Sequence, residues 1–395
     1  MADLEAVKDR MVAEVDRLAD VLLDASHSIH EHPELGFEEH HAHDVLTTIL
    51  EGEGVEVERG AFGLKTAFAA RAGSTGPTIA VLCEYDALPG IGHACGHNVI
   101  GTAGLGAGLA AAAVAEEVGG RVVILGTPAE EGGGGKVFMA DKGALDGVDA
   151  AMMVHPAGAD LRSMNAIAIQ QVHVRYTGKA AHAAAAPHKG RNALDAAVLG
   201  YMNVAALRQH IKPQERIHGI FTDSGDAANI VPAKAGAIWY VRSPKMRSLE
   251  TLKQRVLDCL EAGAKAAGCE MTHEWMDPAY ADLVDLEPFD DLYVANAARL
   301  GRDVLDHRAI PGVVGSTDMG NVSYLVPSIH PMIQVSPPHV AIHTEEFVQY
   351  ARGAEGDAAV LDGAKALALT VADLWMVDGA LDAVKAAFEA ADRRN

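Results

Sequence analysis

The sequence predicts an α/β protein in which a mixed, largely parallel sheet is covered by helices and a smaller α+β domain is inserted. Three observations support this fold class. Short apolar strands alternate with helical segments in the first part of the chain, strands with apolar–polar alternation follow, and strand–helix alternation then returns. The main domain is therefore expected to be discontinuous, with residues 1–168 and 285–395 on either side of an inserted domain at residues 169–284.

The length and composition fit two compact domains. A chain of 395 residues exceeds what one hydrophobic core usually fills. Hydrophobic residues make up 49% of the chain and charged residues 22%, which is the ordinary balance of a globular protein. The formal net charge of -22 argues against nucleic acid or an anionic membrane as a partner, because both attract basic surfaces. Small molecules and metal cations are the expected ligands.

The N-terminus and the cysteines predict a cytoplasmic protein. Residues 1–32 lack the basic start and short apolar stretch of an export signal. The longest weakly polar stretch, from Val99 to Ala115, is too short to predict a membrane span. Four cysteines without a regular framework are typical of a reducing compartment: Cys83, Cys95, Cys259 and Cys269.

The main domain is predicted from helices and short buried strands. Apolar residues recur with helical period up to about Glu53, and His32-Pro33 interrupts them, which predicts two helices and a turn. A Gly/Ala-rich helix is expected from Gly101 to Glu117, between the first two strands, and this order implies parallel pairing. The apolar runs predicted as strands are residues 78–83, 121–126 and 150–154.

The inserted domain is predicted from a different strand pattern. Residues 171–176 and 235–242 alternate apolar and polar side chains, as half-exposed strands do. Helices are expected from about Asn192 to His210 and, with clear amphipathic spacing, from Leu249 to Ala267. These elements predict an antiparallel sheet covered by helices.

The loop after the first strand carries candidate metal ligands. Ligand sites in parallel sheets lie beyond the carboxyl ends of the strands, and the segment from Glu84 to Asn98 follows such an end directly. Cys95 and His97 place a thiol and an imidazole two residues apart, and both groups bind zinc and similar ions. Taken alone, the pair is weak evidence, and a buried cysteine beside a surface histidine explains it better.

The ends of the next two strands add metal-type residues. Glu130 and Glu131 lie in a glycine-rich turn after the second strand, and His155 ends the third. Adjacent acids are usually solvated, but at this edge one carboxylate can bind a metal while its neighbour acts as a general base. Three successive strand ends therefore predict a metal site.

The glycine-rich segments do not match nucleotide-binding loops. A phosphate-binding loop ending at Gly135-Lys136 requires a glycine where the chain has Glu130 and a hydroxyl side chain where it has Val137. The glycines at 101, 104, 106 and 108 lack the dinucleotide-binding spacing and favour close packing of a helix on the sheet.

Six motifs follow one another along the chain: residues 32–39, 85–98, 130–131, 178–182, 229–232 and 343–347. They resemble, in the same order, the zinc metallopeptidase and amidohydrolase family of aminoacylase, hippurate hydrolase and carboxypeptidase G. The similarity is greatest to the branch of aminobenzoyl-glutamate hydrolase and β-alanyl-lysine dipeptidase. The resemblance implies a metal-dependent amidohydrolase or dipeptidase that cuts the amide bond of an N-acyl amino acid or dipeptide.

The resemblance also implies a centre of two divalent metal ions in the main domain. Cys95 would bridge them, with His97 and His155 completing one site and Glu131 and His343 the other. Two cations favour a deprotonated sulfur, so a bridging thiolate is chemically reasonable. Thiolate favours zinc, while histidine and carboxylate ligands also tolerate manganese or cobalt.

By the same resemblance, Glu130 is the general base for a metal-bound hydroxide. Many relatives have a His-x-Asp pair where this chain has Glu84-Tyr85-Asp86, and the departure removes one expected ligand. We expect Asp86 to orient a ligand histidine from behind.

Further roles implied by the resemblance fall on the inserted domain and a late loop. The inserted domain is expected to act as a lid and to form a homodimer, in which His182 reaches a partner's active site and stabilises the oxyanion. Asn229 and Arg242 match positions that hold the substrate's carboxylate or carbonyl, and Ser316 and Thr317 lie in a loop similar to the substrate pocket.

Two other functions remain open. A catalytically silent protein that captures peptides or acyl-amino acids would have lost the base or ligands, and this chain keeps both. An amidohydrolase of ureido compounds such as allantoate also fits the fold, but the bridging cysteine disfavours it, because that chemistry is associated with the His-x-Asp branches. The sequence does not identify the substrate.

Overall fold

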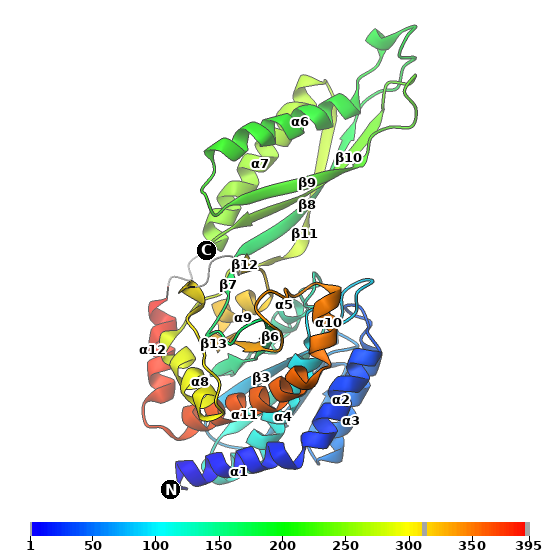
Figure 1. The fold of residues 1–395 in the computed structure, drawn as a ribbon. Helices are drawn as coiled ribbons and strands as arrows, with labels where there is room; N and C mark the ends of the chain where they lie inside the picture. The colour runs from blue at the N-terminus through cyan, green and yellow to red at the C-terminus, as the bar shows by residue number, and fades with distance from the viewer. Residues whose placement is uncertain (1, 310–313, 392–395) are drawn as a thin grey trace. The chain divides into compact units, whose positions relative to one another are not determined.

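A computed structural model describes residues 2–309 and 314–391 of the chain. The chain divides into two compact units, and each is described by itself. The first unit holds the residues up to Asn165 and those from Leu283 onward, and the second holds Ala166–Asp282 (Figure 1). The first unit is therefore built from two separate segments of the chain.

A six-stranded mixed sheet forms the centre of the first unit, in the order β1-β2-β4-β3-β5-β13. Its strands are β1 (Glu56–Arg59), β2 (Phe68–Ala72), β3 (Thr78–Glu84), β4 (Arg121–Thr127), β5 (Ala150–Met152) and β13 (Ser328–Ile329). The four strands from β4 to β13 pair in parallel, whereas β1 and β2 are antiparallel. The mixed, largely parallel sheet predicted from the sequence is confirmed.

Helix α4 (His97–Val118) packs closely on this sheet because glycines face it. A Cβ atom at Gly104 would lie 2.7 Å from the Leu82 carbonyl oxygen, and one at Gly108 would lie 2.4 Å from Cγ1 of Ile124. By length and composition α4 alone among the described helices could cross a membrane, but 89% of its apolar window is buried inside the protein. Helix α11 (Ala354–Met376) packs against α4, and both belong to one apolar core.

The N-terminal segment forms three helices where the sequence predicted two: α1 (Leu4–Arg17), α2 (Ala19–Glu31) and α3 (His40–Gly52). The first predicted helix is divided at Leu18, which is buried. This break lets Met11 and Val15 on α1 pack into the same core as Leu22 on α2. A continuous helical period in the sequence does not reveal such a change of direction.

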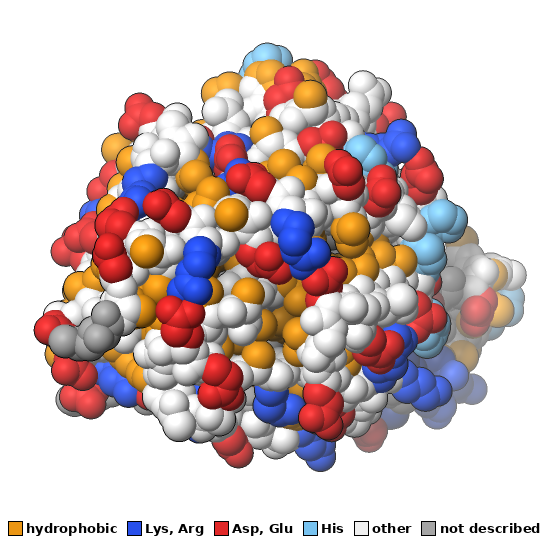
Figure 2. Space-filling model, turned by 90° about the horizontal axis from the view of Figure 1, so that it is seen from below, with side chains coloured by type: hydrophobic (Ala, Val, Ile, Leu, Met, Phe, Trp, Pro, Cys, Tyr) orange, Lys and Arg blue, Asp and Glu red, His pale blue; other side chains and the backbone are white. Residues whose placement is uncertain are grey.

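The remaining elements of the first unit are short or peripheral. They are β6 (His155–Ala157), β14 (Met332–Gln334), β12 (Val314–Gly315), α5 (Gly135–Ala140), α8 (Glu287–Arg299), α9 (Met319–Leu325), α10 (Glu345–Ala351), α12 (Ala380–Ala390), and the short 3₁₀ turns Ala61–Gly63 and His307–Ala309. A two-residue strand, β7 (Asn165–Ala166), ends this part of the chain. Figure 2 shows one face of the molecule, on which acidic and basic side chains are interspersed.

The second unit is an antiparallel sheet in the order β11-β8-β10-β9 with two helices on one face. Its elements are β8 (Ala168–Thr177), α6 (Ala193–Leu207), β9 (Arg216–Asp223), β10 (Lys234–Ser243), α7 (Met246–Ala266), β11 (Glu270–Tyr280), and the 3₁₀ turns Pro187–Lys189 and Arg208–His210. Val172 and Trp239 point into the helix-covered core, whereas alternate residues of β8 and β10 face away from it. The predicted helix to His210 ends at Leu207 and continues as a 3₁₀ turn.

Candidate metal centre

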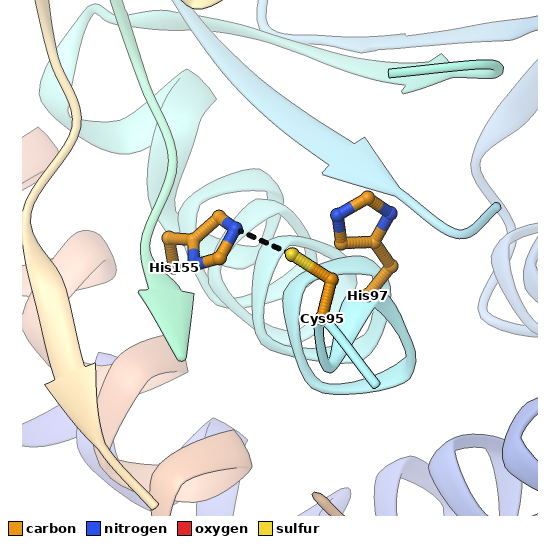
Figure 3. Close-up of side chains that lie close together, drawn as sticks. All are labelled: Cys95, His97 and His155. Carbon is orange, nitrogen blue, oxygen red and sulfur yellow. Dashed lines mark hydrogen bonds between the residues drawn. The ribbon is translucent and has the colours of Figure 1, made fainter. Parts of the chain in front are cut away.

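Loops at the carboxyl edge of the sheet bring three metal-type side chains together. Cys95 lies in the loop after β3, His97 begins α4, and His155 begins β6. The sulfur of Cys95 is 3.4 Å from Nε2 of His155, as the dashed line in Figure 3 marks. The candidate ligand atoms of the three residues all lie within 4.8 Å of one another. We call them the first ligand set.

A second ligand set shares Cys95 with the first. It consists of Cys95, Glu131 and His343, again with ligand atoms within 4.8 Å. Nε2 of His343 lies 3.3 Å from the Cys95 sulfur and 3.1 Å from Oε1 of Glu131. The backbone N–H of His343 donates to the Ala94 carbonyl at 2.7 Å, which fixes the loop of His343 beside the cysteine. The five predicted ligands therefore meet in the two groups that the sequence proposed, with the sulfur in common.

Hydrogen bonds at Nδ1 leave Nε2 as the candidate ligand atom of His97 and of His155. Nδ1 of His97 lies 3.0 Å from Oδ1 of Asp86, and Nδ1 of His155 lies 2.8 Å from the Pro156 carbonyl oxygen. Since both partners accept hydrogen bonds, the Nδ1 of each ring carries a proton, and Nε2 is the atom of each ring that can bind a metal. Nε2 of His97 is buried without a hydrogen-bond partner among the described residues. Thiolate, imidazole and carboxylate donors in this arrangement fit divalent ions such as zinc.

Burial perturbs the titration of these groups. Burial raises the pKa of the Cys95 thiol well above its ordinary value, and the nearby Glu131 carboxylate adds to the rise. Burial also lowers the pKa of His155 well below its ordinary value, so this imidazole is neutral. A neutral imidazole is the form that binds metal. Two cations that share the Cys95 sulfur would stabilise its thiolate form.

Glu130 and Glu131 lie in a tight turn after β4, which we call the acid turn (residues 128–135). Burial raises the pKa of Glu130 well above its ordinary value, and the carboxylates of Glu84 and Glu131 raise it further. The pKa of Glu131 is instead lowered, because hydrogen bonding to His343 and the charge of His97 outweigh its burial. Two adjacent carboxyl groups with opposite shifts suit two different roles, one as a proton carrier and one as an anionic ligand.

Two carboxylates hold the backbone of the acid turn: Glu39 accepts the N–H of Ala129 at 2.8 Å, and Asp86 accepts that of Glu131 at 2.9 Å. A third carboxylate, Asp318, accepts the N–H of Lys136 directly after the turn, at 3.0 Å. Ala129 has a φ of 59°, a left-handed conformation that is unusual outside glycine. Its close neighbour Gly36 has no room for a side chain, since a Cβ there would lie 2.8 Å from the Ala129 Cβ. The motif of residues 32–39 therefore supports the acid turn.

A buried ion network lies behind the acid turn and was not predicted. Nζ of Lys136 is 2.5 Å from Oε1 of Glu84 and 2.6 Å from Oδ1 of Asp318. Glu84 also forms a third ligand set with His97 and Glu130. From the sequence, Glu84 was expected only at the position of a lost ligand, and Lys136 only in a segment that does not match a phosphate-binding loop. The position of Glu84 at the end of a strand was the signal that could have identified it.

His330 is another buried side chain near the ligand sets that was not predicted from the sequence. Its ring stacks on that of His155 with 5.3 Å between centroids, and neither ring nitrogen has a hydrogen-bond partner among the described residues. Burial lowers the pKa of His330 to about 4, so the ring is neutral. His330-Pro331 follows β13 as His155-Pro156 follows β5, so strand-end position was again an available signal.

The second unit brings His182 and Asn229 together. His182 forms an isolated β-bridge with Ile230, and the N–H of Ala183 donates to the Asn229 carbonyl at 2.9 Å. Both predicted residues are exposed. Nδ1 of His182 accepts from the N–H of Ala185 at 3.2 Å, so Nε2 is the nitrogen that carries the proton and faces outward as a donor.

Arg242 lies on β10, on the face of the sheet opposite the helices. It is half-buried, its Nε has no hydrogen-bond partner among the described residues, and burial lowers its pKa. An under-bonded guanidinium of this kind suits a carboxylate ligand. In the first unit Ser316 is half-buried, and Thr317 is buried with Oγ1 accepting from the Met319 N–H at 3.2 Å. The structure therefore gives the Thr317 hydroxyl a helix-capping contact.

Comparison with known proteins identifies one family. The family model described as "Peptidase family M20/M25/M40" matches residues 80–373, which include all three ligand sets. This range covers more than half of the chain.

Individual relatives agree with that match. The Xaa-Arg dipeptidase of Mus musculus is 39% identical over 98% of this chain and 93% of its own. A p-aminobenzoyl-glutamate hydrolase component of Escherichia coli (strain K12) is 37% identical over 65% of this chain and 57% of its own. The crystal structure of the aminobenzoyl-glutamate utilization protein from Klebsiella pneumoniae covers 92% of this chain and 98% of its own, with a TM-score of 0.73 and 21% identity. At that identity the structural likeness supports the fold alone.

Proposed function

Since the chain belongs to peptidase family M20/M25/M40 and is a metal-dependent hydrolase of amide or peptide bonds, we propose that it hydrolyses small dipeptides with Glu130 as general base. The predicted family and its dipeptidase and aminobenzoyl-glutamate hydrolase relatives are confirmed. The observation that carries the proposal is that two ligand sets share Cys95 within reach of a buried carboxyl group, Glu130.

We assign the first set to one divalent ion and the second to another. When bound, the two ions supply Lewis-acid polarisation of the scissile carbonyl and lower the pKa of a coordinated water. The Glu130 carboxyl is buried beside His97, with 3.9 Å between Oε2 and Nε2. In its ionised form, Glu130 would take a proton from the attacking water and return it to the departing amine. Asp86 keeps His97 oriented and fixes the Glu131 N–H meanwhile.

The substrate class is proposed from the relatives and from Arg242. The relative that matches almost the whole chain is named for dipeptides with a C-terminal arginine. Arg242, with an under-bonded guanidinium, is assigned to the free carboxylate of such a dipeptide. His182, Asn229, Ser316 and Thr317 are assigned to substrate binding, with His182 donating to the oxyanion.

A homodimer through the second unit is also part of the proposal. Strand β9 lies at the edge of its sheet. Two of its apolar residues are exposed, Ile220 to 67% and also Phe221. Helix α6 exposes Val198, Leu199 and Met202. An unpaired edge strand with apolar side chains favours pairing with a second copy. In that dimer we assign the oxyanion role to His182 of the partner subunit.

The metal and the location follow from the chemistry of Cys95. We propose zinc or manganese as the resident ion, since thiolate favours zinc while imidazole and carboxylate ligands also accept manganese and cobalt. A cytoplasmic, reducing location is proposed because the sulfur must stay reduced to serve as a ligand.

A hydrolysis assay with a substrate panel tests this function. Metal-free protein would be reloaded with zinc or manganese and given Xaa-Arg, Xaa-Lys and Xaa-Glu dipeptides, N-acetyl amino acids, p-aminobenzoyl-glutamate and allantoate. We expect release of the C-terminal amino acid, with basic dipeptides turned over fastest. Activity on allantoate alone would overturn the substrate class, and binding of dipeptides without turnover would identify a silent binding protein.

A further inference from the structure

Among the described residues, three ligand sets meet in the first unit, and the third does not contain Cys95. It consists of Glu84, His97 and Glu130, and its ligand atoms also lie within 4.8 Å of one another. Glu84 and His97 are fully buried, and Glu130 is nearly so. Two carboxylates and an imidazole are sufficient donors for a divalent ion. Geometry alone therefore does not reserve the ions for the sets that contain the cysteine.

The first and third sets compete for one nitrogen. Nδ1 of His97 is held by Asp86, so Nε2 provides its only lone pair. That nitrogen lies 3.7 Å from Oε2 of Glu84 and 3.9 Å from Oε2 of Glu130, while its ring stands edge-on to His155. A lone pair directs itself to one cation at a time. An ion bound between Glu84 and Glu130 would thus remove His97 from the first set.

The buried Lys136 ammonium opposes this competition. Its Nζ lies 2.5 Å from Glu84 and 2.6 Å from Asp318, and its side chain is 1% exposed. Burial by itself would lower the pKa of Lys136, but the charges of Asp318 and Glu84 outweigh it and raise the pKa above its ordinary value. The ammonium is therefore a permanent positive charge fixed against Glu84.

We propose that Lys136 occupies the cation position at Glu84 and so keeps divalent ions out of the third set, reserving His97 for the set with Cys95. A divalent ion bound by Glu84 would lie close to the buried ammonium, and like charges in a buried setting repel strongly. The exclusion also keeps divalent ions away from Glu130, the proposed general base. This inference rests on the proposed function in taking the two Cys95 sets as the metal sites.

Two double variants with the same change of charge test the role of Lys136. Lys136→Met with Asp318→Asn removes one positive and one negative charge and keeps the third set intact. Lys136→Met with Glu84→Gln makes the same change of charge but breaks the third set. Each double variant removes the ammonium together with one of its two carboxylates, so the net charge of the buried network is the same as in the unaltered protein. Circular dichroism and thermal melting would establish that both are folded.

Cobalt(II) titration of the metal-free proteins gives the readout. Cobalt bound to a thiolate has a sulfur-to-metal charge-transfer band, and both Cys95 sets contain the sulfur while the third does not. Bound cobalt would be counted by elemental analysis after dialysis and compared with the band intensity. Cys95→Ser would show that the band arises from this cysteine.

We expect the band to grow in proportion to bound cobalt in the unaltered protein and in the Lys136→Met, Glu84→Gln variant. The Lys136→Met, Asp318→Asn variant is expected to take up roughly one equivalent of cobalt without the band. Equal band intensity per bound cobalt in both double variants would overturn the inference. Uptake of cobalt without the band by the unaltered protein would overturn the inference as well. This outcome does not depend on the folding of any variant. Absence of the band from the unaltered protein would instead contradict the proposed Cys95 ligation.

Discussion

Asp86 contacts one residue of each Cys95 ligand set: Oδ1 lies 3.0 Å from Nδ1 of His97, and Oδ2 accepts the backbone N–H of Glu131 at 2.9 Å. His97 belongs to the first set and Glu131 to the second. A single carboxylate that belongs to neither set therefore contacts a residue of each. Burial would raise the pKa of Asp86, but the charge and hydrogen bond of His97 outweigh it and lower the pKa, so the group is anionic.

Replacing Asp86→Asn is expected to weaken metal binding about 10- to 100-fold, the usual effect of removing a carboxylate behind a ligand histidine. The amide keeps the shape of the side chain but loses the charge that fixes the His97 tautomer. Competition with a chromophoric chelator measures the affinity. Asp141→Asn, at the end of α5, is the control and should bind metal normally. Unchanged affinity in Asp86→Asn would show that Asp86 does not act through the ligands.

Replacing Glu130→Gln is expected to lower kcat by at least about 100-fold, because the proton carrier is lost while the ligands remain. Metal content, measured by elemental analysis, should stay near two ions per chain. Full activity in this variant would contradict the assignment of Glu130 as general base. A loss of bound metal from this variant would show instead that Glu130 is a ligand.

Replacing Cys95→Ser is expected to remove most of the bound metal from both sets, since they share this sulfur. A serine hydroxyl group binds zinc much more weakly than a cysteine thiolate does. The matched control is Cys269→Ser in the second unit, where the thiol is half-buried and belongs to no ligand set among the described residues. Retention of both ions by Cys95→Ser would exclude a bridging role.

Glu39 predicts a dependence of stability on pH. Burial raises the pKa of Glu39 to about 7, from an ordinary value of 4.5, although Thr66 donates a hydrogen bond to it. Between these two values the folded protein holds a proton that the unfolded chain releases, so this group's contribution to stability falls as pH rises from 4.5 to 7. Glu39→Gln cannot ionise and keeps an oxygen for the Ala129 N–H. It should be stabilised relative to the unaltered protein above pH 7 by up to about 3 kcal/mol.

Thermal melting of both proteins from pH 4.5 to 8 measures this effect. The difference in melting temperature should grow with pH and level off above 7. A difference that is the same at every pH would show that Glu39 is ionised throughout. Glu39→Ala, which also removes the acceptor from the Ala129 N–H, should be destabilised at all these pH values.

Mixing two inactive variants tests whether His182 acts across a dimer. Chains with Glu130→Gln and chains with His182→Ala each lack one part of the site. If His182 comes from the partner subunit, half of the randomly mixed dimers hold one complete site, giving about a quarter of full activity. Mixing Glu130→Gln with Cys95→Ser is the control, because both changes affect the same unit and restore nothing. No recovery in the first mixture would place His182 in its own chain's site, or show that no dimer forms.

The parts of the fold that the sequence predicts are those whose pattern records burial. Strands β3 and β4 are buried along almost their whole length and appear as uninterrupted apolar runs. Strands β1 and β11 were missed because most of their side chains are exposed and their formation depends on hydrogen bonding to β2 and β8. Edge strands of this kind leave little trace in hydrophobicity.

The residues of the site also divide into those that strand position predicts and those that it does not. Cys95, His97, Glu131 and His155 follow strand ends, so the topology of a parallel sheet places them together. His343 is 248 residues from Cys95 and was identified by resemblance alone. The Lys136 network was not predicted, since its partner Asp318 is 182 residues away and a single lysine after glycines has no distinctive pattern.

The division of the first unit into two chain segments has a consequence for synthesis on the ribosome. Cys95, His97 and His155 leave the ribosome before the second unit, whereas His343 and α11 follow it. Until this late part of the chain emerges, the face of α4 that packs against α11 is uncovered and Cys95 lacks His343 as a neighbour. A nascent or truncated chain therefore exposes an apolar helix beside an incomplete thiolate site, and both faults are repaired by the same late segment.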